Sequence, residues 1–281
     1  MWVGLVAVCA GIASPVVLAG QTLRGPTAAG WQAYVAAIEA RVERERGQAL
    51  TSSTAIERGQ VLVEPVRMRG PGGDLEVPDA TVNHWRGLAL IPGARLDDVL
   101  SRLEREPPDT RQQDVLASAV LDQRPGWNKV SLRVHRSLVL SAVFDTEHET
   151  TFQRQGAARA SSQSTATKIV EVDHAGTPSE RAKRPDEDRG LLWRWNAYWR
   201  YEQVDRGVLV ECESLTLSRH VPVLLGPVVG PLMNKVAKES MERTLVTLRE
   251  RFGTPGTAKV SEQPVGKGGR RLARAQRSST S

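Results

Sequence analysis

The sequence predicts an α+β protein in which a curved antiparallel sheet of about seven strands wraps around a long C-terminal helix. Three observations support this prediction. Long runs of β-type residues follow one another between Val115 and Pro222, with turn residues between them. Within that region, residues 191–217 form a hairpin pattern with one strongly aromatic face. An apolar stripe at helical spacing then follows in residues 231–252, and it provides a partner for the aromatic face.

The composition is that of a globular protein, and the charge is concentrated at the C-terminus. Of the 281 residues, 40% are hydrophobic and 25% are charged, and the formal net charge is +6. Residues 253–281 hold six Lys or Arg side chains and one Glu, so this tail accounts for +5 and the rest of the chain for about +1. We expect a disordered basic tail that solubilises the protein or touches an anionic membrane surface. The tail lacks interleaved aromatic residues, so no nucleic-acid partner is expected.

The first nineteen residues form an apolar run without a charged side chain. Val17 and Ala19 occupy the small-residue positions that precede a signal-peptidase site, and the run is short for a bilayer span of roughly 20 residues. We therefore expect residues 1–19 to be a secretory signal and the mature protein to be periplasmic or secreted. The alternative is an uncleaved membrane anchor. Without this segment, Cys212 is the only cysteine, so no internal disulfide is expected.

An N-terminal helix and a connector are expected over residues 20–78. The pattern predicts a helix over residues 26–46, whose apolar face consists of Trp31, Tyr34, Val35 and Ile38. A short strand is expected at residues 60–64, and the sequence Gly70-Pro71-Gly72-Gly73 indicates a flexible break before the main domain.

The main domain is expected over residues 79–252. It begins with a β-type run at residues 81–91, and an amphipathic helix follows in residues 94–106 with apolar residues at i, i+3, i+4 and i+7. The strands that follow are predicted at 115–123, 127–136, 138–154, 157–173, 191–204 and 207–218. Residues 174–190 are charged and rich in turn formers, which is typical of a surface loop.

Alternation along the first strand of the hairpin separates two faces. The aromatic face consists of Trp193, Trp195, Ala197, Trp199 and Tyr201. The polar face, which we expect to meet water, consists of Arg194, Asn196, Tyr198, Arg200 and Glu202. The stripe of the C-terminal helix consists of Met233, Ala237, Met241, Leu245, Leu248 and Phe252. The aromatic face is expected to pack on this stripe, where its rings either line a ligand cavity or fill the core.

Two segments carry a resemblance to a known family. They are HWRGLALIPGARLDDVLSRL, which starts at His84, and WRWNAYWRYEQVDRGVLVECESLTLSRHVP, which starts at Trp193, together with the helix after it. The region of about residues 80–252 resembles the START-like (SRPBCC) superfamily of helix-grip proteins, including uncharacterised exported bacterial members. The resemblance implies a sheet gripping the terminal helix, with a hydrophobic cavity between them. It implies no catalytic motif, because members share a cavity and not a set of reacting groups. The N-terminal helix is an addition to the family pattern; it could pack on the sheet, plug the cavity mouth or contact a partner.

No enzyme motif stands out in the sequence. The five histidines show no metal-ligand spacing, and no glycine-rich phosphate loop is present, so neither a metal nor a cofactor is expected. Glu211 and Glu213 share a strand face and could form a carboxylate pair with one raised pKa. Their alternative role is to face water or to pair with Arg194 and Arg200 across the hairpin. His148 could bind a ligand carbonyl, although an exposed strand position is its default interpretation.

The leading hypothesis is an exported, non-enzymatic protein that binds a hydrophobic small molecule or lipid in the cavity. One alternative is a cyclase- or aromatase-like enzyme in which Glu211, Glu213 or His148 polarises a bound ketide. The other alternative is a structural cell-envelope module whose aromatic residues fill the cavity. The candidate cavity residues are Trp193, Trp195, Trp199, Tyr201, His148, Glu211, Glu213, Met233 and Met241.

Overall fold

The computed structural model describes residues 23–253 except for residues 71, 138–140, 186 and 221–225. The expected signal segment and basic tail therefore lie outside the described residues. The strands are β1 (Leu62–Pro65), β2 (Arg69–Gly70), β3 (Gly73–Asp74), β4 (Ala80–Pro92), β5 (Val115–Arg124), β6 (Trp127–Ser137), β7 (Ser141–Arg154), β8 (Arg159–Asp173), β9 (Arg181–Ala182), β10 (Arg194–Val204) and β11 (Gly207–Arg219). The helices are α1 (Gly25–Glu45), α2 (Thr54–Glu57), α3 (Leu96–Arg105) and α4 (Gly226–Phe252).

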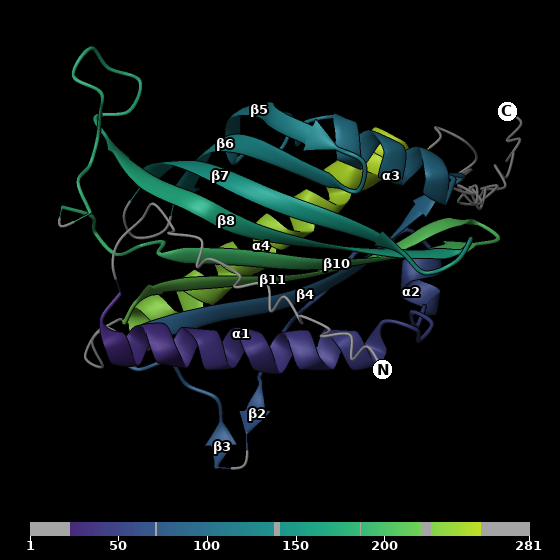
Figure 1. Ribbon diagram of the computed structural model, residues 1–281, viewed down its shortest axis with the longest axis horizontal. Coiled ribbons are helices and arrows are strands. Elements are labelled where there is room, and N and C mark those ends of the chain that lie inside the picture. The colour runs from purple at the N-terminus through teal and green to yellow at the C-terminus, as the bar shows by residue number, and fades with distance from the viewer. Residues whose placement is uncertain (1–22, 71, 138–140, 186, 221–225, 254–281) are drawn as a thin grey trace, which may run out of the picture.

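The main sheet is antiparallel between all of its paired strands, and its order is β1-β4-β11-β10-β8-β7-β6-β5, with β9 paired to β8. The last strand, β11, lies beside the first long strand, β4, and pairs with it along its whole length. The sheet curves around α4, which crosses its concave side (Figure 1). This arrangement confirms the predicted α+β helix-grip fold.

The approach of α4 to the sheet depends on Gly87 of β4. A Cβ atom at this position would lie 2.5 Å from Leu245 Cδ1 and 2.9 Å from Met241 Cγ, so a larger residue would have to displace these two side chains of α4. Leu245 is fully buried, and it packs with Met241, Trp85 and Cys212. The predicted stripe of α4 therefore faces the sheet, while the side chain of Met233 lies outside the described residues.

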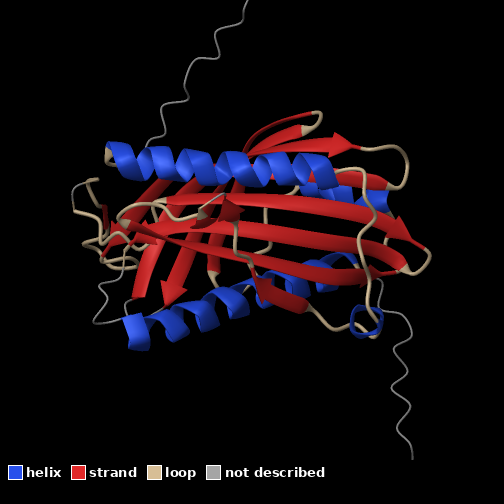
Figure 2. Ribbon diagram, turned by 90° about the horizontal axis from the view of Figure 1, so that it is seen from below, coloured by secondary structure: helices blue, strands red, loops and turns tan. Residues whose placement is uncertain are grey.

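The second long helix, α1, lies on the opposite face of the sheet, so strands separate the two helices (Figure 2). Trp31, Tyr34 and Ile38 are buried against Tyr198, Leu215 and Leu217 of the hairpin. Of the three roles left open for the N-terminal helix, the structure shows packing on the sheet. The expectation that the polar face of the hairpin meets water is wrong over this area, because α1 covers Asn196 and Tyr198, which are 6% and 4% exposed.

Gly207 closes the β10–β11 turn in a conformation that other residues avoid. Its φ is +145°, and a Cβ atom there would clash with the backbone carbonyl oxygen of Ile91 on the neighbouring strand. We expect Gly207→Ala to destabilise the protein by about 3 kcal/mol, since the clash adds to the backbone strain. Gly156→Ala is the control, because its φ is +76° and nothing lies within 4 Å of the added carbon. Urea denaturation of the two variants measures the difference, and equal losses would contradict a role for the clash.

Candidate cavity

A cavity lies between the concave face of the sheet and α4, and it has two adjoining chambers. The first chamber has a volume of about 160 Å³ and the second about 220 Å³. The side chains common to both walls are Trp195, Ala197, Trp199 and Thr244. Because β10 supplies three of these four residues, the hairpin singled out by its sequence forms the junction between the chambers.

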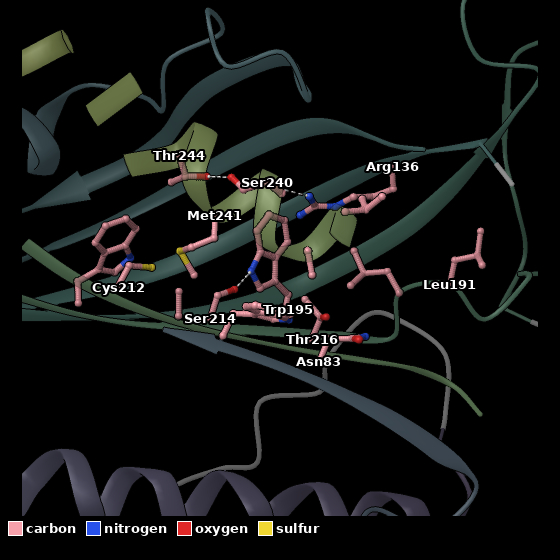
Figure 3. Close-up of a pocket in the computed structure, with 16 residues that line it drawn as sticks. Asn83, Arg136, Leu191, Trp195, Cys212, Ser214, Thr216, Ser240, Met241 and Thr244 are labelled. Atoms are coloured by element: carbon pink, nitrogen blue, oxygen red, sulfur yellow. Dashed lines mark hydrogen bonds between the residues drawn. The ribbon is translucent and has the colours of Figure 1, made fainter. Parts of the chain in front are cut away.

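The first chamber is apolar at one end and charged at the other (Figure 3). Trp85, Cys212 and Met241 line its apolar end, and Arg136 reaches into it from β6. Burial raises the pKa of the Cys212 thiol well above its ordinary value, so the group is a neutral part of the wall.

The second chamber also has largely apolar walls with several polar side chains on them. It lies below α3, where Leu103 contributes to its lining, and it also includes side chains from β6, β7, β8 and β10. Its hydroxyl groups are paired with one another: Thr150 Oγ1 donates to Ser164 Oγ over 3.1 Å, and Ser162 Oγ lies 3.2 Å from the Tyr201 hydroxyl. These four hydroxyl groups therefore have partners without a ligand.

Trp195 stands at the boundary of the two chambers. Its Nε1 donates to Ser214 Oγ over 3.2 Å, which fixes the orientation of the indole. The Arg136 guanidinium carbon lies 4.9 Å from the centroid of the indole, over its face. The His148 ring meets the same indole edge to face, with 4.9 Å between ring centroids. One aromatic side chain therefore contacts both Arg136 and His148.

Arg136 is held in place by Ser240 of α4 and by Asp114, which precedes β5. Its Nη1 donates to Ser240 Oγ over 2.8 Å and to Asp114 Oδ2 over 3.4 Å. Asp114 also accepts a hydrogen bond from Arg243, whose Nη1 lies 3.9 Å from the carboxylate of Glu239. The pKa of Asp114 is lowered although burial opposes ionisation, because Ser240 and the two guanidinium groups stabilise its charge.

His148 is neutral under ordinary conditions. Burial, together with the nearby charge of Arg136, lowers its pKa to about 4. Its Nε2 lies 3.0 Å from Thr146 Oγ1, and that hydroxyl donates its only hydrogen to the Leu132 carbonyl. Nε2 must therefore carry the hydrogen, which leaves Nδ1 as a bare acceptor. The default expectation of an exposed His148 is wrong, because the residue is 5% exposed and lines the second chamber.

Glu213 lies on the face of the sheet away from the cavity, between β11 and α1. It is 3% exposed, and its carboxylate is bound by Arg41 of α1, by Arg86 Nη2 at 3.2 Å and by His84 Nε2 at 2.5 Å. Burial by itself would raise the pKa of Glu213, but these partners lower it to about 2. The idea that Glu211 and Glu213 form an acid–base pair with a raised pKa is therefore wrong for Glu213.

The structure separates eight of the nine predicted cavity residues into two groups, and the side chain of the ninth, Met233, lies outside the described residues. Five of them line the cavity, namely Trp195, Trp199, Tyr201, His148 and Met241. Glu211 and Glu213 instead face the α1 side, where Glu211 pairs with Arg200 across the hairpin over 3.2 Å, as its alternative role predicted. Trp193 also leaves the aromatic face, because it precedes β10 and packs with the cluster of Trp31 and Leu217.

Sequence reasoning missed Arg136, although a signal was present. Val130, Leu132 and Val134 alternate along β6 and are buried, so the next residue in the same alternation, Arg136, points to the same inner face. A charged residue at the next inward position after a series of buried apolar residues therefore indicates a charged group on the inner face of the sheet.

In the part of the chain that the structure describes, no helix is both long and apolar enough to cross a membrane. Within the same residues, no group of three or more His, Cys, Asp or Glu side chains is placed to hold a metal ion.

No protein-family model and no curated protein matches this chain. Among solved structures, the chain is similar to a STAR-related lipid transfer protein from Xanthomonas axonopodis, with 18% identity, 63% of this chain and 95% of that chain covered, and a TM-score of 0.42. It is also similar to the human StarD13 lipid transfer and protein localization domain, with 14% identity, coverage of 83% and 100%, and a TM-score of 0.42. For human STARD10 the identity is 13%, the coverage 75% and 80%, and the TM-score 0.42. The strand order and terminal helix described above are those of a helix-grip fold.

Proposed function

We propose that this protein is a non-enzymatic carrier that binds a hydrophobic small molecule or lipid between the sheet and α4. The observation that supports this function best is the two-chambered cavity, whose walls include Trp85, Trp195, Trp199 and Met241. Together the chambers reach the lower part of the range of roughly 300–1,000 Å³ that is typical of small-molecule sites. This size favours a ligand with one chain or a compact ring system over a phospholipid with two acyl chains.

The positions of Glu211 and Glu213 favour binding over acid–base catalysis. Glu211, Glu213 and His148 were the sequence-based candidates for polarising a ketide; the two carboxylates lie on the α1 side of the sheet, while His148 lines the second chamber as a neutral hydrogen-bond acceptor. A structural module with a filled core is disfavoured by the free volume beside Trp195 and Ala197.

We also propose that the protein is exported, on the basis of the apolar, uncharged residues 1–19. N-terminal sequencing of the mature protein from its own host tests this proposal. A mature chain that begins near Gly20 is expected, and one that begins at Met1 would contradict cleavage.

Ala197→Phe tests binding in the cavity. The new ring would occupy the junction of the two chambers, because Ala197 lines both. We expect the affinity for N-phenyl-1-naphthylamine, a neutral apolar fluorescent probe, to fall at least about tenfold. Ala182→Phe adds the same ring at an exposed position on β9 and should leave probe binding unchanged.

Circular dichroism establishes that both variants are folded before binding is compared. Unchanged probe affinity in folded Ala197→Phe would place the probe elsewhere. Native mass spectrometry of protein purified from its own host provides a second test. Failure to find a co-purified apolar ligand, together with failure of the probe to bind the wild-type protein, would overturn the proposed function.

A further inference from the structure

We propose that the ligand of this cavity is an apolar-bodied acid that also carries a hydroxyl group: its anionic group binds Arg136, and its hydroxyl donates to His148 Nδ1. This inference rests on the proposed function and deepens it, because it assigns the chemical class of the ligand and its orientation across Trp195. The two polar groups lie on walls that are otherwise largely apolar, so each one selects strongly for a complementary group.

Arg136 presents unused donors to the first chamber. Only Nη1 is engaged, by Ser240 and Asp114, and neither Nε nor Nη2 has a hydrogen-bond partner among the described residues. The side chain keeps 22% exposure, and the residue lines the chamber. Asp114 neutralises part of the charge but is shared with Arg243. A guanidinium edge next to apolar walls favours a carboxylate or phosphate, because charge-assisted hydrogen bonds are the strong ones.

His148 presents the opposite chemistry to the second chamber. Its Nε2–H is used on Thr146, and Nδ1 has no hydrogen-bond partner among the described residues. The side chain is buried from bulk water and lines the chamber. A neutral imidazole with a bare nitrogen accepts a hydrogen bond and offers none, so it selects a hydroxyl or an amide N–H over a carbonyl.

Asn128 adds a second unsatisfied acceptor to the same chamber. Its Nδ2 donates to the carbonyls of Leu103 and Glu104, over 3.0 and 3.1 Å, which fixes the orientation of the amide. Its Oδ1 is buried and has no partner. Asn128 and His148 are diagonal neighbours across β6 and β7, since Val130 pairs with His148 and Asn128 with Thr150. Two acceptors without donors, His148 Nδ1 and Asn128 Oδ1, thus lie in or behind the wall of this chamber.

The geometry limits the spacing of the two groups on the ligand. The Arg136 guanidinium carbon and the His148 ring centroid each lie 4.9 Å from the Trp195 centroid, so they are at most about 10 Å apart. This limit favours a compact skeleton of one or two rings with both groups on its rim over a long chain, and its rings would lie beside Trp195 and Trp199.

Three related compounds test the inference at pH 7 by displacement of N-phenyl-1-naphthylamine from the wild-type protein. They are 2-naphthol, which has the hydroxyl alone, 2-naphthoate, which has the anion alone, and 6-hydroxy-2-naphthoate, which has both. We expect 6-hydroxy-2-naphthoate to bind at least about tenfold more tightly than 2-naphthol and several-fold more tightly than 2-naphthoate. This comparison needs no variant.

Two variants assign each group to its partner. Arg136→Met is expected to weaken both acids about tenfold or more and to leave 2-naphthol unchanged. His148→Phe keeps an aromatic ring against Trp195 and is expected to weaken the two hydroxyl compounds about fivefold while leaving 2-naphthoate unchanged. The control is Arg133→Met, the same substitution three residues earlier on β6, where the side chain pairs with Asp145 and Glu180. It should change none of the affinities.

The outcomes separate this inference from the function on which it rests. If the neutral probe binds but the three compounds bind equally, the inference is overturned and a hydrophobic carrier remains. Equal weakening of all three compounds by Arg136→Met would also overturn it, because the residue would then only support the fold. If neither the probe nor any compound binds the wild-type protein, the proposed function fails as well.

Discussion

Glu213→Ala is expected to lower the free energy of unfolding by about 3 kcal/mol. The carboxylate is buried at the interface of α1 and the sheet, where Arg41, Arg86 and His84 bind it. Removing one partner of a buried ion pair leaves the other charges without compensation, which costs about 3–5 kcal/mol. We take the lower end of this range because the Arg41 and Arg86 side chains are 16% and 28% exposed and therefore keep some solvation.

The same group predicts a pH dependence of stability. The pKa of Glu213 is about 2 in the folded protein, below the ordinary value of 4.5. The unfolded chain therefore binds a proton at higher pH than the folded protein does. The stabilisation is fully present above about pH 5 and is lost as the pH falls from about 4.5 towards 2. The wild-type protein should lose more stability over this window than Glu213→Ala.

Urea denaturation at pH 7 and at pH 3 measures both effects. Glu64→Ala on β1 is the control, since Glu64 is exposed, and its effect should stay within about 0.5 kcal/mol. If the free energy of unfolding of Glu213→Ala at pH 7 falls by less than about 1 kcal/mol, the ionic contacts of Glu213 with Arg41, Arg86 and His84 contribute little to stability.

Leu245→Ala is expected to destabilise the protein by about 3 kcal/mol. Leu245 is fully buried between α4 and β4, and it occupies the space above Gly87. Truncation removes apolar contacts and leaves a void, for which leucine-to-alanine changes in cores cost about 2–5 kcal/mol. Since β4 and β11 pair along their full length, the sheet cannot easily collapse into this void.

Thermal and urea denaturation of Leu245→Ala and Leu121→Ala provide the matched comparison. Leu121 on β5 is 50% exposed, so the same truncation there should change the free energy of unfolding by less than about 0.5 kcal/mol. Similar losses in the two variants would be incompatible with close packing of α4 on β4.

Much of the fold could be predicted because its elements have strong local patterns. The helix expected over residues 94–106 is α3, Leu96–Arg105, and the strand expected over 207–218 is β11, Gly207–Arg219. The small elements α2, β2, β3 and β9 were not predicted, and β9 lies inside the expected surface loop of residues 174–190. Segments this short rarely show a periodic pattern, although β1 was expected from its run of apolar residues. The fate of the polar hairpin face was also missed, because alternation separates two faces of a strand but does not say whether a helix covers one of them.

The candidate cavity was predictable only in part. Trp195 and Trp199 were predicted as cavity candidates because they share the aromatic face of their strand, and the apolar stripe of the C-terminal helix was expected to pack on that face. Both line the cavity in the structure. Trp193 was misplaced because the alternating pattern includes it, whereas the strand β10 begins only at the next residue, Arg194. Contacts such as Arg136 with Asp114 join residues that are 22 positions apart, and no local pattern encodes the pairing.

The coverage of β10 and β11 by a helix on each side has a consequence for how this protein can diversify. Along β11, Cys212, Ser214 and Thr216 border the cavity, whereas Glu211, Glu213 and Leu215 alternate with them towards α1. Under the proposed function, we expect substitutions at the first set to alter ligand preference while leaving the α1 interface intact, and those at the second set to do the reverse. Neighbouring codons in one strand can therefore evolve under separate selective pressures, one for the cargo and one for folding.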